Sequence, residues 1–435
     1  MLKKFCAFLL AAVLALTFCG CKSSPFNADT LISPPNPTGD FAPIKEALQK
    51  SVAGKFKLKF PIGGSYRSAF IFADLEQSGK EDYCVAFYTL SDSEESAIHI
   101  NLIKHIKDTW VSVSDLFYSA EEIEKVEFAD LSKDGFLEIL VGYRVYSDVD
   151  KKVSVYSISA DTMRQRLLED YSQFIVTDLT VDGKNELFVI NRTPSDNSAT
   201  AALYTLNSGG IKEEALCAID GNVNSYNLPV LSKLGNDQPA VLVDAYTSKG
   251  MITEIIYYKD GRLVAPFFDS KLGMNSVLQR DGNTEITDIN NDGRIDVPLL
   301  SALTLTANSE GSSYMTTWVN YNGSELYAVA HTVTNSLDNY YIVIPENLAE
   351  NIGVERLPLE KLRVFYLWDK VQDAPLNELF RIKVEDSASY KSENKDGFFE
   401  LTRDSVYVYS AKIAEAGTKY NVTEKLLKDS FKLIV

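Results

Sequence analysis

A short acidic loop that ends near a glycine recurs along the middle of the chain, and it constrains the fold more than any other feature. The strictest copy, TDINNDGRIDV, covers residues 287–297, and close copies cover 129–139 and 177–187. A weaker copy covers 73–83, and a fifth, at 232–240, has lost nearly all of its acids. Every copy lies between two apolar runs, and successive copies begin roughly 50 residues apart. Each period therefore has room for four short strands.

Repeated units of four short strands are typical of the blades of a β-propeller. The composition agrees with a mainly β fold, because Tyr (23) and Phe (22) are frequent and Met (5) is rare. The loops predict about five four-stranded blades, or six or seven if degenerate blades lie outside the pattern. We expect a small α+β C-terminal domain to follow this propeller.

The repeats resemble the FG-GAP or VCBS repeats of integrin-α-like β-propellers over about residues 55–337. The resemblance implies that each acidic loop joins the first two strands of a blade, and that such loops often hold calcium. It is specific for the repeat and implies no particular activity.

The acidic loops carry the residue types that bind Ca²⁺, which takes six to eight oxygen ligands. Side chains at the first, third, fifth and ninth positions can converge, and the glycine after the fifth permits the sharp turn. The candidate ligands are Asp288, Asn290, Asp292 and Asp296; Asp130, Ser132, Asp134 and Glu138; and Asp178, Thr180, Asp182 and Glu186. A weaker set, in which a serine replaces one carboxylate, is Asp74, Glu76, Ser78 and Asp82. At 232–240 we expect no metal.

Metal-free turns are the alternative interpretation of these loops. Asp and Asn side chains can themselves accept hydrogen bonds from the backbone N–H groups of a turn. Against this, several carboxylates in one loop repel each other unless a cation is present. The sequence leaves both interpretations open, and a bound Ca²⁺ would have a structural role at the blade corners, not a catalytic one.

The start of the chain has the pattern of an export signal. Lys3 and Lys4 precede an apolar run at 5–18 that is too short to span a bilayer comfortably. The sequence FCGC that ends at Cys21 resembles the lipobox of bacterial lipoproteins. This resemblance implies that Cys21 carries lipid, palmitate included, and anchors the chain at the extracytoplasmic face of the cell membrane. An ordinary cleaved signal with incidental cysteines is the alternative.

The chain therefore divides into four expected parts. Residues 1–20 are the signal peptide, and 21–40, rich in Ser and Pro, form a flexible linker. Residues 41–337 form the propeller, which begins with a short helix whose apolar face is Ile44, Ala47, Leu48 and Val52. We expect a strand at 55–60 to complete the last blade and close the ring.

Residues 338–435 lack the repeat and are expected to form the small α+β domain, with a divergent final blade as the alternative. The predicted elements are strands at 340–344, 361–368, 378–384 and 405–413 and a helix at 423–431.

Charge and residue types exclude several classes of function. The formal net charge of −17 argues against nucleic acid as a partner. Beyond Cys21 only Cys84 and Cys217 remain, so no disulfide framework is expected. His99 and His105 lie on the same face of one predicted strand and are interpreted as surface residues. The sequence shows no nucleophile elbow, phosphate loop or zinc pattern.

We therefore expect a membrane-anchored, non-enzymatic binding or scaffold module whose ligand is a protein or a glycan. One alternative is an enzyme that acts on extracellular polysaccharide or peptide, which would need acids with Tyr, Arg or Lys in one pocket. Another is a structural protein of envelope assembly that acts through its C-terminal domain.

Overall fold

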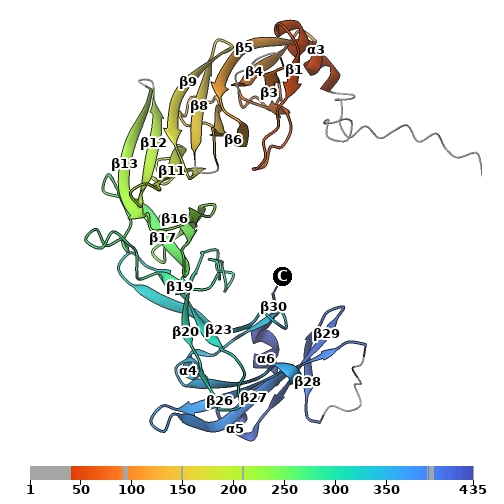
Figure 1. Ribbon diagram of the computed structural model, residues 1–435, viewed down its shortest axis with the longest axis vertical. Helices are drawn as coiled ribbons and strands as arrows, with labels where there is room; N and C mark the ends of the chain where they lie inside the picture. Colours follow the sequence, from red (N-terminus) through yellow and green to blue (C-terminus); the bar gives the residue numbers. More distant parts are fainter. Residues whose placement is uncertain are drawn as a thin grey trace, which may run out of the picture.

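A computed structural model describes residues 41–91, 97–147, 150–207, 210–388, 390 and 396–434. Five antiparallel sheets follow one another along an open arc, and a sixth sheet with short helices completes the C-terminal end (Figure 1). The fold is thus mainly β, as predicted. The signal, Cys21 and the linker lie outside the described residues. In the part that is described, no helix is long and apolar enough to cross a membrane.

The second and third sheets are simple meanders, whereas the first and fourth also contain short strands that pair with a strand that is not next to them in the chain. The first contains β1 (Phe56–Leu58), β2 (Phe70–Ala73), β3 (Tyr83–Leu90), β4 (Ala97–Ile106) and β5 (Thr109–Ser119). The second contains β6 (Glu122–Ala129), β7 (Glu138–Arg144), β8 (Lys151–Ser159) and β9 (Thr162–Asp170). The third contains β10 (Gln173–Thr177), β11 (Glu186–Thr193), β12 (Ser198–Asn207) and β13 (Gly210–Asp220). The fourth contains β14 (Ser225–Tyr226), β15 (Val230–Lys233), β16 (Pro239–Tyr246), β17 (Gly250–Lys259), β18 (Arg262–Val264) and β19 (Gln279–Asp281).

Two further sheets form the C-terminal end. The fifth contains β20 (Val297–Ala302), β22 (Tyr314–Tyr321), β23 (Leu326–Asn335), β24 (Tyr340–Val343) and β30 (Phe431–Leu433). The sixth contains β21 (Thr304–Leu305), β25 (Ile352–Leu357), β26 (Leu362–Asp369), β27 (Ala374–Asp386), β28 (Phe399–Arg403) and β29 (Tyr407–Ile413). The helices at this end are α4 (Glu346–Ala349), the 3₁₀ turn η2 (Pro358–Glu360), α5 (Glu415–Lys419) and α6 (Glu424–Ser430).

Both faces of each inner sheet are apolar. Successive residues of a strand point to opposite faces, and in these strands successive residues are hydrophobic. In β11, Leu187 and Val189 pack toward the second sheet, whereas Phe188 and Ile190 pack toward the fourth. The acidic loops at 130–137 and 178–185 join the first two strands of their sheets, as expected, whereas the loop at 74–82 joins β2 to β3 in a sheet that also contains β1. The predicted four-stranded unit is therefore confirmed for the second and third sheets, while the first has five strands and the fourth has six.

The two ends of the arc are covered by other elements and not by each other. Helix α3 (Ala42–Ser51) buries Ile44, Ala47 and Leu48 against Cys84, Ala86 and Tyr88 on the outer face of the first sheet. The predicted closure by the strand at 55–60 is wrong, because β1 pairs with β3 of the first sheet and not with the last blade. Among the described residues, no strand pairing joins the first sheet to the fifth.

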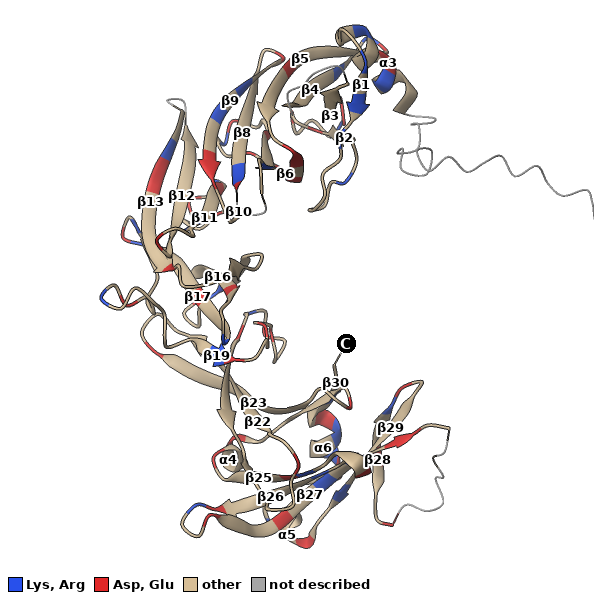
Figure 2. Cartoon of the chain, viewed as in Figure 1, with Lys and Arg blue, Asp and Glu red and all other residues tan. Residues whose placement is uncertain are grey.

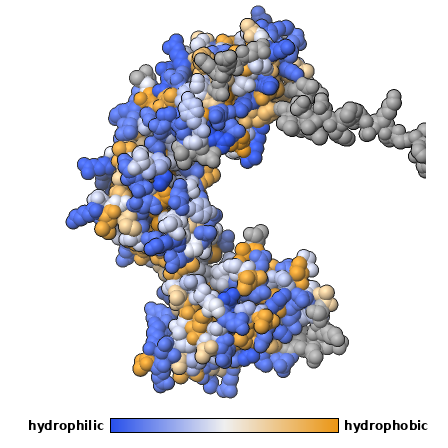
Figure 3. Space-filling model, in the orientation of Figure 1, coloured by the Kyte–Doolittle hydropathy of each residue, from blue (hydrophilic) through white to orange (hydrophobic). Residues whose placement is uncertain are grey.

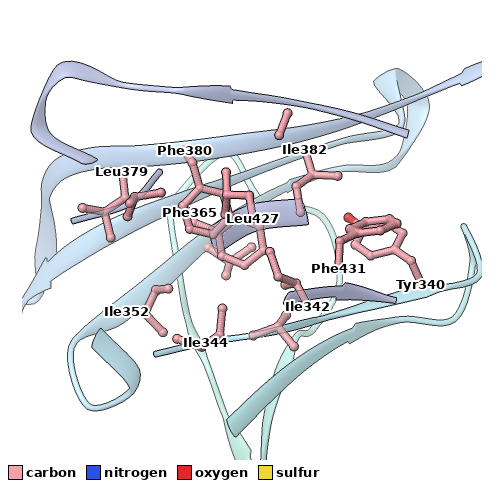
Figure 4. Close-up of a cluster of buried hydrophobic side chains, with 14 of the residues drawn as sticks. Tyr340, Ile342, Ile344, Ile352, Phe365, Leu379, Phe380, Ile382, Leu427 and Phe431 are labelled. Atoms are coloured by element: carbon pink, nitrogen blue, oxygen red, sulfur yellow. The ribbon is translucent and has the colours of Figure 1, made fainter. Parts of the chain in front are cut away.

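The fifth sheet and the C-terminal sheet share one core, shown in Figure 4. Tyr340 and Ile342 of β24 pack with Phe365 and Phe380 of the sixth sheet and with Phe431 of β30. The boundary proposed at residue 338 lies between β23 and β24, which pair directly. The C-terminal end therefore cannot be separated there without cutting a sheet.

Most elements expected at this end are present with small changes in their limits. The four predicted strands correspond to β24, β26, β27 and β29, and the helix to α6, which Thr423 caps through a hydrogen bond to the Leu426 N–H. Strands β25, β28 and β30 were not predicted. β30 is three residues long and gains its place only by pairing with β24.

Candidate functional site

The acidic loops at 130–138, 178–186 and 288–296 have one backbone design. In each, the first aspartate accepts hydrogen bonds from the N–H groups of the fifth residue and of the glycine. For Asp178 these bonds are 3.2 Å from Asp182 and 3.0 Å from Gly183. Asp130 and Asp288 accept the matching bonds from Gly135 at 3.0 Å and Gly293 at 2.8 Å. The glycines have φ of 77–88°, a conformation that other residues rarely adopt.

The ninth residue of each of these loops is a buried carboxylate. Glu138, Glu186 and Asp296 are 3%, 1% and 0% exposed. Glu138 and Glu186 are the first residues of β7 and β11, and Asp296 forms an isolated bridge with Thr287. Each accepts a hydrogen bond from the N–H of the second loop residue, namely Leu131 and Leu179 at 2.8 Å and Ile289 at 3.2 Å. The buried carboxylate therefore holds the start of its loop in place.

Burial raises the pKa of these three carboxyl groups. It raises the pKa of Glu138 to about 7, with a further contribution from the negative charges of Asp134 and Asp130. It raises the pKa of Asp296 to about 6 in the same way, and that of Glu186 is also raised. A carboxyl group with a raised pKa can be a catalytic acid. Because the same shift recurs at the same position of three loops, it belongs to the repeat and not to one active site.

The loop at 178–186 brings its acids closest together. One carboxylate oxygen from each of Asp178, Asp182 and Glu186 lies within 4.8 Å of the other two. Thr180 donates a hydrogen bond of 2.7 Å from its hydroxyl to Glu186 Oε1, so the fourth predicted ligand lies in the same group. Within the described part of the chain, this is the one group of three acids arranged to hold a metal ion. The donor set, all hard oxygens, fits Ca²⁺.

The other two strict loops keep the backbone design without this close grouping of three acids. Asn290 lies beside Asp292, since its amide donates to Asp292 Oδ2 at 3.2 Å. The Ser132 hydroxyl is buried and has no hydrogen-bond partner among the described residues. Metal binding at these two loops stays a prediction.

The weaker loop at 74–82 has a different register. Asp74 accepts hydrogen bonds from the N–H groups of Ser78 at 2.8 Å and Gly79 at 2.6 Å, as in the other loops. However, Ala73 pairs with Tyr83, the tenth residue, whereas Thr177 pairs with the ninth, Glu186. Tyr83 thus takes the buried position, and Asp82 is left outside it. Glu76 turns away to accept a 2.6 Å hydrogen bond from the Tyr83 hydroxyl. The predicted convergence of these four residues does not occur.

The fifth loop, at 232–240, is a tight turn that supports its neighbour. The Ser232 hydroxyl accepts a 2.8 Å hydrogen bond from the Ile295 N–H, and Asp237 forms an ion pair with Arg294 at 2.8 Å. Asp237 is the one acid between Ser232 and Ala240, and it pairs with Arg294. Among the described residues, no group of three acids forms at this loop.

Successive loops also contact one another. The Leu137 N–H donates to the Leu75 carbonyl at 2.8 Å, which joins the first two loops. Asn185 donates from its side-chain amide to the Asp130 carbonyl at 3.3 Å, which joins the second and third. The loops therefore form a continuous acidic rim along one end of the sheets.

A polar pocket of about 730 Å³ lies at this rim where the first three sheets meet. Its lining includes residues from two acidic loops (Glu76, Ser132, Asp134, Phe136, Glu138), from Tyr83 and Lys104 of the first sheet, from Ser157–Asp161 and Arg166 of the second, and from Leu206 and Asn207 of the third. We call this the rim pocket. Acids, Tyr, Lys and Arg are thus gathered in one place.

A hydrogen-bonded network fixes one wall of the rim pocket. Lys104 donates to Asp161 at 2.8 Å and to Glu76 at 3.2 Å, and the Tyr83 hydroxyl lies between the same two carboxylates. Burial and the hydrogen bond to Glu76 raise the pKa of Tyr83. Burial opposes the charge of Lys104, but its bonds to Asp161, Tyr83 and Glu76 outweigh this and raise its pKa. Both groups are therefore held protonated.

Sequence patterns did not identify Lys104, Asp161 or Arg166. Lys104 and Arg166 are charges within strands, where they look like solvent-facing residues, and Asp161 lies in an ordinary hairpin turn. Their grouping depends on the stacking of the sheets. The two histidines have partners on the same face of β4: His99 contacts Asp115 at 2.9 Å and His105 lies 3.9 Å from Asp82.

Comparisons with known proteins add little to this geometry. No protein-family model matches the chain, and no curated protein is similar enough to count as a relative. Solved structures with similarity include a protein from Lactobacillus plantarum (TM-score 0.29, 10% identity, 71% of this chain and 83% of that one). A rhamnogalacturonan lyase from Bacillus licheniformis has a TM-score of 0.30 at 10% identity, over 74% of this chain and 75% of its own. An exo-β-1,3-galactanase from Phanerochaete chrysosporium has 0.27 at 8%, over 76% and 79%. Such low scores carry no argument about activity.

Proposed function

We propose that the chain is a non-enzymatic binding module built from FG-GAP/VCBS-type blades, anchored through lipid on Cys21 at the extracytoplasmic face of the cell membrane. The observation that carries this proposal is the rim pocket, which two successive acidic loops and the β8–β9 hairpin enclose. Repetition of the same loop gives the rim a fixed shape, and a rigid concave surface suits recognition.

The distribution of hydrophilic and charged residues favours a polar ligand. On the face seen in Figure 3, hydrophilic residues predominate and hydrophobic ones lie in separate small areas. Figure 2 shows acidic and basic residues distributed along the arc. A glycan or a polar protein segment, which offers hydrogen-bonding groups of both kinds, fits the mixture of Arg166, Lys104 and carboxylates in the rim pocket.

We also propose that the loop at 178–186 holds Ca²⁺ in a structural role. Asp178, Thr180, Asp182 and Glu186 would be its ligands, and the ion would offset the repulsion between their carboxylates. The ion would stabilise the corner between β10 and β11 and keep the rim in one conformation.

The rim pocket also contains the residue types that the enzymatic alternative needs. A polysaccharide lyase could use Tyr83 or Lys104 as its general base only if the pKa of that group were lowered toward neutral pH. The hydrogen-bonded network has the opposite effect, since it raises the pKa of both. A hydrolase would instead use a pair of carboxyl groups, but Glu138, whose pKa is raised to about 7, holds the loop backbone in the same way as Glu186 and Asp296 do in their loops. We therefore favour binding over catalysis.

Binding and catalysis can be separated with the full chain in detergent micelles. We would measure its affinity for a panel of envelope glycans and peptides, for the wild type and for Arg166→Gln. Arg166 lines the rim pocket and donates to Ser157 Oγ at 2.6 Å. We expect the variant to lose about tenfold in affinity, the loss of one charge-assisted hydrogen bond.

The matched control is Arg262→Gln, an exposed arginine on β18 away from the rim pocket, which should bind like the wild type. Each ligand would also be weighed by mass spectrometry after overnight incubation. Unchanged masses support a binding module. Shortened or unsaturated saccharides would instead establish the enzymatic alternative, and equal affinities of both variants would move the binding site elsewhere.

A further inference from the structure

A second, smaller pocket lies at the end of the sheets opposite the acidic rim. The register fixes this position. Gln173 begins β10, which runs toward its acidic loop, and it pairs with Ile190 near the far end of β11. Arg192 follows at that far end, and Lys151 begins β8 at the same end of the second sheet. We call this the basal pocket.

The basal pocket is small and contains no acid. Its volume is about 100 Å³, and its lining is Lys151, Tyr171, Ser172, Gln173, Arg192, Pro194, Asn224, Ser225 and Tyr226. Two cations and several hydroxyl or amide groups thus face one space, in a chain whose formal net charge is −17. A positive pocket on so acidic a protein selects for anions, because the rest of the surface repels them.

Arg192 is the central group of this pocket. Its Nε donates to the Gly221 carbonyl at 3.1 Å, which fixes the plane of the guanidinium, and the side chain is half-buried. No ion pair is found for Arg192 among the described residues. Its two terminal nitrogens are therefore oriented and remain available to a ligand. A guanidinium presents such a pair of N–H groups in the geometry of a carboxylate.

Lys151 is the second cation of the basal pocket. Its Nζ lies 3.2 Å from Glu124 Oε2, so this carboxylate positions the amine but lies outside the lining. Tyr171 also lines the pocket, but its hydroxyl is buried beside Gly142 of β7, in the core between the second and third sheets. The groups that remain for a charged ligand are therefore Arg192 and Lys151.

We propose that the basal pocket binds the carboxylate group of an extracytoplasmic ligand. A volume of about 100 Å³ admits a carboxylate but not a whole sugar ring or amino-acid residue, so the remainder of the ligand lies outside on the surface. Two sources have this chemistry: a uronic acid in an acidic polysaccharide and the C-terminal carboxylate of a peptide. The site is distinct from the rim pocket and does not depend on it.

Calorimetric titration of the full chain in micelles at low salt tests this proposal. The probes are galacturonate and its methyl ester, and the dipeptide Gly-Gly and its C-terminal amide. We expect one acid to bind and its uncharged partner to bind at least about tenfold more weakly. The acid that binds identifies the source. Inorganic phosphate, which a guanidinium can also bind through two oxygens, is the third arm, and we expect it to bind more weakly than that acid.

Arg192→Gln should remove the binding, and Lys151→Gln should weaken it several-fold. Arg192→Lys, which keeps the charge but not the paired N–H groups, should behave more like Arg192→Gln than like the wild type. Thermal unfolding of each variant shows whether it is folded, and Lys151→Gln tests the pocket even if the Arg192 variants are not. Arg166→Gln in the rim pocket should leave this binding unchanged, so failure here is distinct from failure of the proposed function.

Three results would overturn the proposal. One is the absence of saturable binding of either acid up to about 10 mM. Another is equal binding of an acid and its uncharged partner, or stronger binding of phosphate. The third is wild-type affinity in both Arg192→Gln and Lys151→Gln.

Discussion

The loops at 178–186 and 74–82 share one sequence pattern but differ in what they gather. Both begin with an aspartate that accepts N–H hydrogen bonds from a glycine five residues later. In the first loop the ninth residue, Glu186, enters the buried position at the start of the second strand. In the other, Tyr83 enters it, one residue later. One extra residue after the glycine therefore decides whether a carboxylate faces the loop.

This difference separates the two contributions of the repeat. The turn itself needs only the first aspartate and the glycine, which both loops keep. The cation site needs in addition a strand register that buries an acid, because a shift of one residue reverses which side chains are buried. The loop at 74–82 instead uses its third residue, Glu76, to build the wall of the rim pocket with Tyr83 and Lys104.

The largest effect is expected when the register of 178–186 is changed to that of 74–82. Insertion of one glycine after Gly183 would move Glu186 out of its buried position and leave the Leu179 N–H without its acceptor. We expect a loss of about 2–4 kcal/mol in the free energy of unfolding, measured with urea. The same insertion after Gly79, where the loop already has the longer register, should cost less than half as much.

Calcium should affect the two loops differently. Millimolar Ca²⁺ should raise the Tm of the wild type by several degrees, since it binds the folded state alone. Asp182→Asn should remove most of this increase, whereas Ser78→Ala in the other loop should leave it unchanged. A wild-type Tm that does not respond to millimolar Ca²⁺ would remove the metal from the 178–186 loop.

A change of pH should show the cost of the buried carboxylates when no divalent cation is present. The pKa of Glu138 is raised to about 7, so between its unfolded value and about 7 the folded state holds a proton that the unfolded state releases. Stability should therefore fall as pH rises through this window, and Tm should be higher at pH 6 than at pH 8. Glu138→Gln should reduce this dependence but not abolish it, because the pKa values of Asp296 and Glu186 are also raised, and Asp82→Asn should leave it unchanged. A Tm that rises over the same window would contradict the assignment.

The smallest effect concerns the wall of the rim pocket. Tyr83→Phe removes the hydrogen bonds to Glu76 and Asp161 but keeps the buried ring, so we expect a loss of about 1 kcal/mol in the free energy of unfolding. Tyr118→Phe, a half-buried tyrosine of the outer strand β5, is the control and should cost less. If both variants lost the same free energy of unfolding, the hydrogen bonds around Glu76 would not stabilise the loop at 74–82.

The sequence predicted the features that repeat and missed those that depend on pairing. The acidic loops and the four-stranded unit follow from local patterns of charge and hydrophobicity. The shift at Tyr83 was not visible, because a match to the loop pattern counts positions and not strand register. The predicted closure failed for the same reason: nothing in residues 55–60 indicates that they pair with β3.

The candidate site was predicted only in part. The four candidate ligands at 178–186 were identified because they all lie in one continuous segment of the sequence. The rim pocket and the basal pocket were not, because Lys104, Arg166 and Arg192 come from different sheets and are brought together only by stacking. Helix α3 and the C-terminal sheet cover the two ends of the stack, and this explains why an array of blades forms an open arc.

Crystals of the protein soaked in Tb³⁺, which occupies Ca²⁺ sites and scatters anomalously, give the most direct test of the central comparison. The structure predicts an anomalous peak among Asp178, Asp182 and Glu186 and none at the loop that contains Asp74. A peak at Asp74, or none at 178–186, would contradict the conclusion that strand register decides which acidic loop binds a cation.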